Sequence, residues 1–220
     1  LITTKGFQDI LLIGRESRYD IYDLVPEFPE PLVPAPMRRE LTERISGTGE
    51  ILQPLSPQEV KVTIQELVDK GANSIAVCLL HSYINPEHEE AIAESIIESF
   101  PDMSFSLSSK VCPEIREYER TSTTVANAYI QPIVSRYLED LESNLDDVPL
   151  YLMLSNGGIA TARSAARTPI RMIESGPAGG ALSAAYFGAQ SGFEDLIAFD
   201  MGGTTAKSCI IEQSIPHFTF

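Results

Sequence analysis

Residues 196–211 hold the side chains best suited to chemistry, in an order typical of a phosphate-binding turn. An apolar run leads to one acid, two glycines and two hydroxyls, and a second apolar run follows: Asp200, Gly202, Gly203, Thr204 and Thr205. This order predicts a strand, a tight turn and a strand. The glycines permit positive φ and close approach of a ligand. Turn amides and hydroxyls can hold phosphate oxygens, and Asp200 can hold hydrated Mg²⁺. An ordinary hairpin explains the same pattern equally well.

A second glycine-rich segment lies about 20 residues before Asp200. It consists of a turn that leads into an Ala/Gly-rich helix expected over residues 178–190, and its candidate ligand-binding residues are Glu174, Ser175, Gly176, Gly179 and Gly180. Free amides at a helix start favour an anion. Close helix packing is the alternative explanation for the glycines, but the position just before the first segment favours a shared nucleotide site.

Three further groups are weaker candidates. Asn156 lies in a turn after an expected strand, where ligands gather in α/β sheets, although an ordinary turn explains it equally. Arg116 and Arg120 could hold a carboxylate or phosphate, whereas a solvated helix face accounts for the same charges. His81 and His88 would form a metal site only with a converging carboxylate, which their spacing does not enforce.

Composition narrows the function classes. Of the 220 residues, 43% are hydrophobic and 21% charged, which is typical of a soluble globular protein. The net charge of −15 argues against nucleic-acid or anionic-membrane partners, and no apolar run is long enough to cross a bilayer. The three cysteines lack CxxC spacing and are expected to be reduced, buried thiols of a cytoplasmic protein. Serine-nucleophile, zinc-protease and Walker motifs are absent from the sequence.

The elements around these residues alternate between strands and helices. Helices are expected over residues 7–13, 57–70, 86–100 and 118–145, with Pro132 kinking or splitting the last, and a short helix is expected from Thr161. Strands are expected over 74–80, 103–107 and 150–154, and a hairpin over 43–53. Five prolines make residues 20–37 an extended connection. The alternation predicts an α/β fold with a parallel or mixed sheet.

Taken in order, the motifs closely resemble the hydantoinase A/5-oxoprolinase family. The resemblance is carried by residues 3–9 (TTKGFQD), 14–15 (GR), 112–124 (CPEIREYERTSTT), 154–158 (LSNGG), 174–180 (ESGPAGG) and 199–204 (FDMGGT). It covers essentially the whole chain, and the last four of these segments, found in the right order, are far more specific than any one of them.

The resemblance implies part of an actin, sugar-kinase and heat-shock-chaperone ATPase fold, comprising the end of one lobe and the start of the next. Residues 1–125 would be the family's N-terminal region and residues 126–220 the start of its ATPase region, within a longer protein. Residues 200–205 would be the second of two phosphate hairpins, with the first before Leu1 and the adenosine-contacting glycines after Phe220. Many relatives carry a second acid where this chain has Ala206 and Lys207, which leaves Lys207 free to meet a phosphate.

The resemblance also implies the activity. Members use ATP and Mg²⁺ to open cyclic amides such as hydantoin and 5-oxoproline, by phosphorylating the amide oxygen. A hydantoinase B-type partner subunit or domain is implied, a homo-oligomer is compatible with it, and this piece alone is expected to be inactive. The alternatives are a ketone-activating subunit of the acetone carboxylase type and a non-catalytic nucleotide-binding domain of the same fold.

Overall fold

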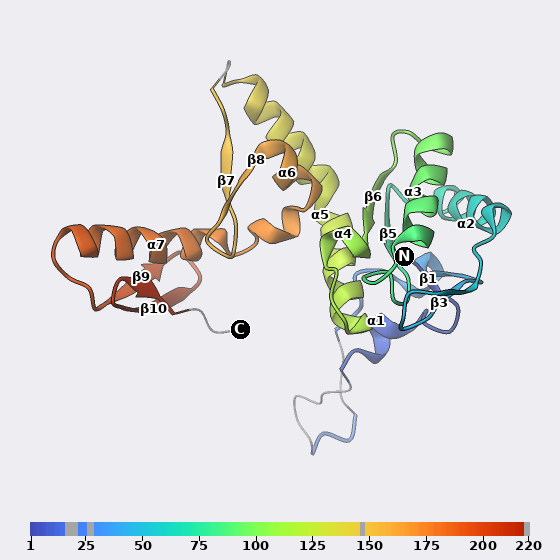
Figure 1. The fold of residues 1–220 in the computed structure, drawn as a ribbon, viewed down its shortest axis with the longest axis horizontal. Coiled ribbons are helices and arrows are strands. Elements are labelled where there is room, and N and C mark those ends of the chain that lie inside the picture. The colour runs from blue at the N-terminus through green and yellow to red at the C-terminus, as the bar shows by residue number, and fades with distance from the viewer. Residues whose placement is uncertain (16–21, 26–28, 146–147, 218–220) are drawn as a thin grey trace. The chain divides into compact units, whose positions relative to one another are not determined.

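The computed structural model describes residues 1–15, 22–25, 29–145 and 148–217. The chain divides into two compact units, Leu1–Ile133 and Val134–Phe220, which are described separately (Figure 1). Part of the expected proline-rich connection, residues 20–21 and 26–28, lies outside the described residues. No helix among the described residues is long and apolar enough to span a membrane. All three cysteines are thiols; Cys78 is buried as expected, whereas Cys112 and Cys209 are partly exposed.

Unit 1 is built on a four-stranded parallel sheet, as the alternation of elements predicted. The strand order is β2-β1-β5-β6. These strands are β1 (Ile2–Thr4), β2 (Arg39–Leu41), β5 (Ser74–Cys78) and β6 (Ser104–Leu107). The expected hairpin is present as β3 (Arg44–Ile45) and β4 (Ile51–Gln53). The helical segments are α1 (Ile10–Ile13), the 3₁₀ turn η1 (Ala35–Met37), α2 (Pro57–Asp69), α3 (Glu87–Ser99) and α4 (Ser108–Val111).

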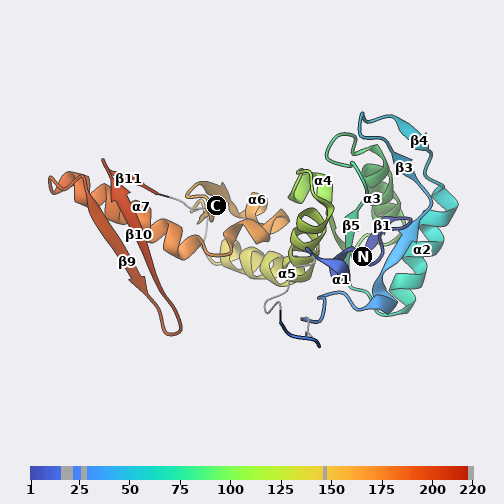
Figure 2. The same cartoon turned by 90° about the horizontal axis from the view of Figure 1, so that it is seen from below.

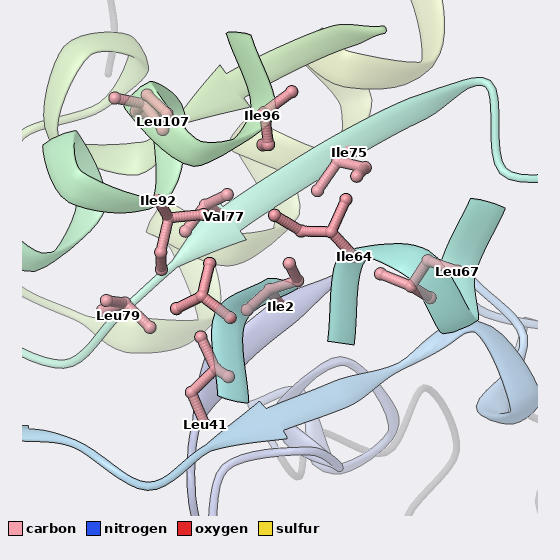
Figure 3. Close-up of a cluster of buried hydrophobic side chains, with 12 residues drawn as sticks. Ile2, Leu41, Ile64, Leu67, Ile75, Val77, Leu79, Ile92, Ile96 and Leu107 are labelled. Carbon is pink, nitrogen blue, oxygen red and sulfur yellow. The ribbon is translucent and has the colours of Figure 1, made fainter. Parts of the chain in front are cut away.

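Helices α2 and α3 bury one apolar face against this sheet (Figure 1). Helix α2 begins where the sequence indicated, since the Ser56 hydroxyl accepts a hydrogen bond from the Glu59 amide at 3.4 Å and Pro57 occupies the first turn. The core between helices and strands is a single aliphatic cluster (Figure 3). Its most completely buried members include Ile64, Val77 and Ile96, so this cluster is the main source of hydrophobic stabilisation in unit 1.

Helix α5 (Glu117–Ser143) is continuous through Pro132, so the expected split does not occur. A proline in a helix interior removes one amide donor, which leaves the carbonyl four residues earlier without its partner. That carbonyl belongs to Ala128, and the Ser74 hydroxyl donates a hydrogen bond to it at 2.7 Å. A side chain at the start of β5 therefore replaces the missing helical bond.

In the described part of unit 2, two antiparallel sheets and three helical segments follow α5. A two-stranded sheet pairs β7 (Tyr151–Met153) with β8 (Ile159–Thr161), and α6 (Ala162–Arg167) follows with Thr161 as its N-cap. The 3₁₀ turn η2 (Pro169–Met172) leads to α7 (Ser175–Gln190). Helix α7 packs beside a three-stranded sheet of order β11-β10-β9 (Figure 2). Its strands are β9 (Leu196–Met201), β10 (Ala206–Glu212) and β11 (Ile215–Pro216).

Candidate functional site

The β9–β10 hairpin has the form predicted for residues 196–211. Its register places Asp200 directly opposite Lys207, and the Gly202 amide donates to the Thr205 carbonyl at 3.0 Å to close the turn. Asp200 and the turn residues 202–205 are exposed. One expectation is wrong: neither Gly202 nor Gly203 adopts a left-handed φ. Both glycines instead have open space where a side chain would stand. A Cβ on Gly203 would meet nothing within 4 Å, and a Cβ on Gly202 would meet only the Thr205 carbonyl oxygen, at 3.9 Å.

Helix α7 begins at Ser175, three residues earlier than expected. Pro177 lies in the first turn, where its missing amide costs no helical bond. Glu174 precedes the helix in a left-handed conformation, with φ of 67°. The amides of Ser175 and Gly176 are therefore at the helix start, where donors lack helical partners. Gly179 and Gly180 lie within the helix instead, so their amides serve helical bonds and are not the free donors that a turn would have supplied.

Close packing does not explain the glycines in the first half of α7. A Cβ on Gly176 or Gly180 would meet nothing within 4 Å, and one on Gly179 would make only ordinary contact with Met153, at 3.6 Å. Gly188 at the far end is different, because its Cβ would lie 2.5 Å from Leu196 Cδ2. The C-terminal end of α7 therefore packs closely against β9, whereas open space remains beside its N-terminal end.

That space is a cavity of about 530 Å³ within unit 2. It is lined by residues of α7 and of both hairpin strands, among them Glu174, Gly176, Gly180, Asp200 and Lys207. A smaller cavity of about 350 Å³ shares Glu174, Gly176, Asp200 and Lys207 and extends to Ser175, Gly202 and Thr205. The structure therefore brings together most of the residues predicted from the two glycine-rich segments. Thr204 is in the turn but is not among the lining residues, and neither is Gly179 or Gly203.

An ion pair between Lys207 and Glu174 joins the hairpin to the start of α7. Both side chains are substantially exposed, at 39% for Lys207 and 62% for Glu174, so solvent screens the attraction and the pair can exchange for another partner. Sequence reasoning identified each residue but missed the pair. Counting back from the turn would have placed Lys207 on the same face as Asp200, but this register gives no sign of the pairing with Glu174.

The turn after β7 contributes a different residue from the one predicted. Ser155 lines the larger cavity, and its hydroxyl has two backbone carbonyls within hydrogen-bonding distance, those of Arg171, at 2.6 Å, and Ile173. The Asn156 side chain instead accepts a hydrogen bond from the Gly158 amide at 3.0 Å within its own turn. This arrangement is the ordinary turn that the sequence analysis left open as the alternative for Asn156.

Arg116 and Arg120 belong to unit 1 and differ sharply in their surroundings. Arg120 is 1% exposed and donates to the carbonyls of Glu114 at 2.8 Å and Leu79 at 3.1 Å, with its guanidinium 5.2 Å from the Tyr83 ring centroid. These contacts make Arg120 a packing residue, contrary to a solvated helix face. Arg116 is exposed and lies 3.9 Å from Glu119.

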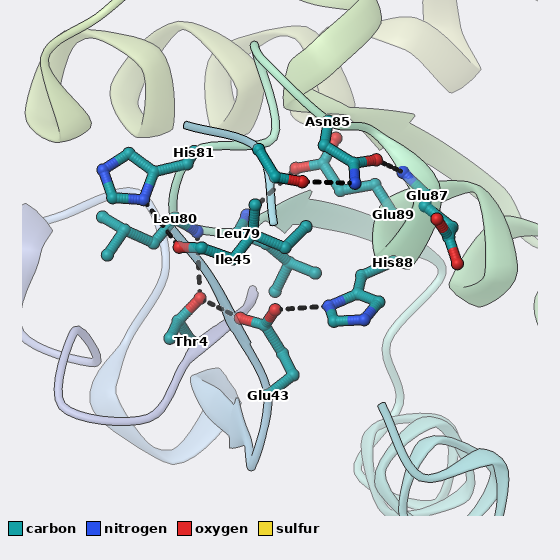
Figure 4. Close-up of polar contacts among 11 residues, drawn as sticks. Thr4, Glu43, Ile45, Leu79, Leu80, His81, Asn85, Glu87, His88 and Glu89 are labelled. Carbon is teal, nitrogen blue, oxygen red and sulfur yellow. Dashed lines mark hydrogen bonds and ion pairs between the residues drawn. The ribbon is translucent and has the colours of Figure 1, made fainter. Parts of the chain in front are cut away.

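His81 and His88 do not converge on a metal site. Among the described residues, no three His, Cys, Asp or Glu side chains lie close enough together to hold a metal ion. His81 Nδ1 contacts the Ile45 carbonyl at 2.7 Å, whereas buried His88 contacts Glu43 at 2.6 Å (Figure 4). Nearby, the buried Glu89 carboxylate accepts from the Leu79 amide at 2.9 Å and the Ser108 hydroxyl at 2.6 Å. These contacts tie the carboxyl ends of the parallel strands to α3.

Known proteins match along almost the entire chain. The hydantoinase/oxoprolinase N-terminal region model matches residues 1–100 and the hydantoinase/oxoprolinase model matches residues 120–220. An uncharacterised protein of Methanocaldococcus jannaschii is 42% identical over 100% of this chain and 33% of its own length. The acetophenone carboxylase gamma subunit of Aromatoleum aromaticum is 31% identical over 100% of this chain and 32% of its own length. The chain thus spans about a third of these relatives.

Among solved structures, the ATP-dependent caprolactamase of Pseudomonas jessenii superposes with a TM-score of 0.85 at 30% identity, over 95% of this chain and 31% of that one. The likeness, together with the parallel sheet of unit 1 and the antiparallel sheets of unit 2, confirms the predicted fold: a mixed α/β part of the actin, sugar-kinase and heat-shock-chaperone ATPase fold. Two family models, relatives matched along the full chain and this structural likeness lead to one conclusion: the chain belongs to the hydantoinase/oxoprolinase family.

Proposed function

We propose that this chain is the phosphate-binding part of an ATP-dependent hydrolase that opens cyclic amides of the hydantoin or 5-oxoproline type. The observation that carries the proposal is the cavity in unit 2, where a carboxylate and a lysine on facing strands meet the glycine-rich start of α7. The caprolactamase likeness supports both the use of ATP and a lactam as substrate. We place the protein in the cytoplasm, with residues 1–125 as the N-terminal region and residues 126–220 as the start of the ATPase region.

The residues around the cavity fit an ATP phosphate group accompanied by Mg²⁺. Mg²⁺ in phosphate sites takes one or two carboxylates and keeps several waters, and the exposed Asp200 carboxylate at the cavity wall suits that role. The bound ion supplies neutralisation of phosphate charge. Gly202, Gly203, Thr204 and Thr205 would offer amides and hydroxyls to phosphate oxygens, as would the amides of Ser175 and Gly176 at the start of α7.

In the proposed reaction the γ-phosphoryl group passes from ATP to the amide oxygen, and ADP leaves. Phosphorylation makes the ring carbon more electrophilic, so that water adds to it. The C–N bond then breaks, which frees the amine and leaves an acyl phosphate, and a second water hydrolyses the acyl phosphate to a carboxylate and inorganic phosphate. In this scheme the residues of this chain orient and neutralise phosphate, which is the main requirement for phosphoryl transfer.

Lys207 lines the cavity and can offer its ammonium group to phosphate, although this ammonium forms an ion pair with Glu174. We propose that bound phosphate draws Lys207 away from Glu174. The exposure of both partners keeps the cost of separating them small, since exposed pairs contribute about 0–1 kcal/mol. Glu174, Gly179 and Gly180 would then shape the cavity rather than donate to phosphate.

A ketone-activating carboxylase subunit is the second candidate, favoured by the identity to the acetophenone carboxylase gamma subunit. The relative is named as one subunit of an assembly, which supports a partner for this protein too; we propose a hydantoinase B-type subunit or domain. A homo-oligomer is compatible with both candidates. A non-catalytic nucleotide-binding domain would bind ATP without turnover.

The test is calorimetric titration of Mg-ATP into the full-length protein and into the 220-residue chain, followed by ATP turnover with hydantoin, 5-oxoproline or acetone. We expect Asp200→Asn and Lys207→Met each to weaken ATP binding or turnover at least tenfold. Glu194→Gln removes an exposed carboxylate of the same unit that does not line the cavity and is the matched control. Absence of binding to the full-length protein refutes the proposal, and turnover stimulated only by acetone favours the carboxylase.

A further inference from the structure

Unit 1 contains a cavity of about 610 Å³, separate from those of unit 2, that the proposed ATPase activity does not use. It lies between α2, α3 and the segment that starts at β4. Aliphatic side chains form much of its wall, and polar residues of α2 and α3 line the rest; the lining includes Ile51, Leu55, Val60, Lys61, His88 and Ser95. An apolar cavity with a few placed polar groups is the usual form of a small-molecule site.

His88 is fixed in one orientation by buried groups behind it. The Glu43 side chain is fully buried and accepts hydrogen bonds from the Thr4 hydroxyl and from His88 Nδ1, the latter at 2.6 Å. With Glu43 as the acceptor, Nδ1 carries a proton, and in the tautomer whose single ring proton is on Nδ1 the Nε2 atom is an acceptor. Figure 4 shows the second ring nitrogen turned away from Glu43, and His88 lines the cavity.

Ser95 is a second polar residue of α3 in the lining of this cavity. Its Oγ atom is buried and has no hydrogen-bond partner among the residues that the structure describes. A buried hydroxyl without a partner costs free energy, so such groups in native proteins call for an explanation. Ser95 lies two turns beyond His88 on the same face of α3, about 10 Å along the helix axis at 1.5 Å per residue. Both residues therefore belong to the face of α3 that lines the cavity.

The charge of the lining selects the ligand. Glu87, Glu94 and Glu98 face a single lysine among the lining residues, Lys61, which already lies 3.7 Å from Glu98. Leaving His88 aside, the lysine and the three glutamates of the lining sum to a charge of 1 − 3 = −2. Such a wall repels carboxylates and phosphates and attracts cations. An ammonium group also supplies the N–H donor that Nε2 requires.

We infer that this cavity binds a small primary amine with an apolar body. The ammonium donates to His88 Nε2, and the body packs against Ile51, Leu55 and Val60. The inference rests on unit 1 alone, so it is independent of the nucleotide site in unit 2.

The probe is cyclohexylamine, titrated into the 220-residue chain at pH 8 while the histidine ring signals are followed by NMR. We expect a saturable shift of the His88 signals, and a weaker effect or none with cyclohexanol and cyclohexanecarboxylate. His88→Asn keeps an N–H donor for Glu43 but removes the Nε2 acceptor, so calorimetric affinity for cyclohexylamine should fall at least tenfold.

Ala91→Phe tests the cavity without touching the buried pair, because Ala91 is an exposed residue of the cavity wall. It should abolish binding, whereas Ile97→Phe, which enlarges an exposed side chain of α3 outside the lining, should not. The inference is overturned if cyclohexylamine gives no saturable shift, if cyclohexanecarboxylate binds as tightly, or if Ala91→Phe binds like the unmodified chain.

Discussion

The hydrogen bond between Ser74 and Ala128 predicts that the stability lost on substituting Ser74 depends on whether residue 132 is proline. In the unmodified chain the Ser74 hydroxyl is 2.7 Å from the carbonyl that Pro132 leaves without a helical partner. Ser74→Ala removes that donor from a carbonyl whose residue is 5% exposed. An unsatisfied buried carbonyl costs about 1–2 kcal/mol, so unfolding of unit 1 should become easier by that amount.

The same substitution should cost less when residue 132 can supply its own amide. In Pro132→Ala, the new N–H can bond Ala128 in the ordinary helical manner. Ser74→Ala in that background should therefore cost about 0.5 kcal/mol or less, and the double-mutant cycle should show a coupling of about 1 kcal/mol.

Urea unfolding followed by circular dichroism gives these free energies. With a slope of about 2 kcal/mol per molar urea, Ser74→Ala should lower the midpoint by about 0.5–1 M. Ser74→Thr keeps the hydroxyl and serves as the control. An equal cost of Ser74→Ala in both backgrounds would contradict the assigned role of Ser74.

Two further predictions concern packing and pH. Gly188→Ala should destabilise unit 2 by about 1–3 kcal/mol in thermal or urea unfolding, because its Cβ would lie 2.5 Å from Leu196 Cδ2. Gly180→Ala in the same helix has open space and should be stabilising by up to about 1 kcal/mol, so equal effects at the two positions would refute this reading. Burial raises the pKa of the Cys78 thiol above its usual 9.0, so the unfolded chain loses this proton first and stability falls as pH rises beyond about 9. In Cys78→Ala, the free energy of unfolding should decline less steeply between pH 8 and 10. An unchanged slope of that free energy against pH would contradict this explanation.

The parts of the fold that the sequence predicted are those with strong local patterns. Helices α2 and α3 have amphipathic repeats and clear starts, and the hairpin at Asp200 has a turn between two apolar runs. Strands β1 and β2 were missed, because each is three residues long and is specified by parallel pairing with a distant partner. Such pairing leaves little trace in local sequence.

The site was predictable in its residue types more than in its geometry. A Gly-Pro-Ala-Gly-Gly run favours a turn by propensity, yet α7 begins at Ser175 because tertiary packing outweighs the weak helix propensity of glycine. The ion pair of Lys207 with Glu174 joins residues far apart in sequence, so only the folded chain reveals it. The role of Ser155 was hidden for the same reason.

The register of β9 and β10 makes the cavity depend on the number of residues in the turn. Asp200 and Lys207 are opposite each other because four residues, Gly202 to Thr205, separate Met201 from Ala206. A slip of one residue would turn the side chains of one strand to the other face of the sheet. The spacing between Asp200 and Lys207 is therefore constrained separately from the identity of the residues between them. Substitutions in the turn can preserve this pairing, whereas a single insertion or deletion would move the carboxylate or the lysine out of the cavity.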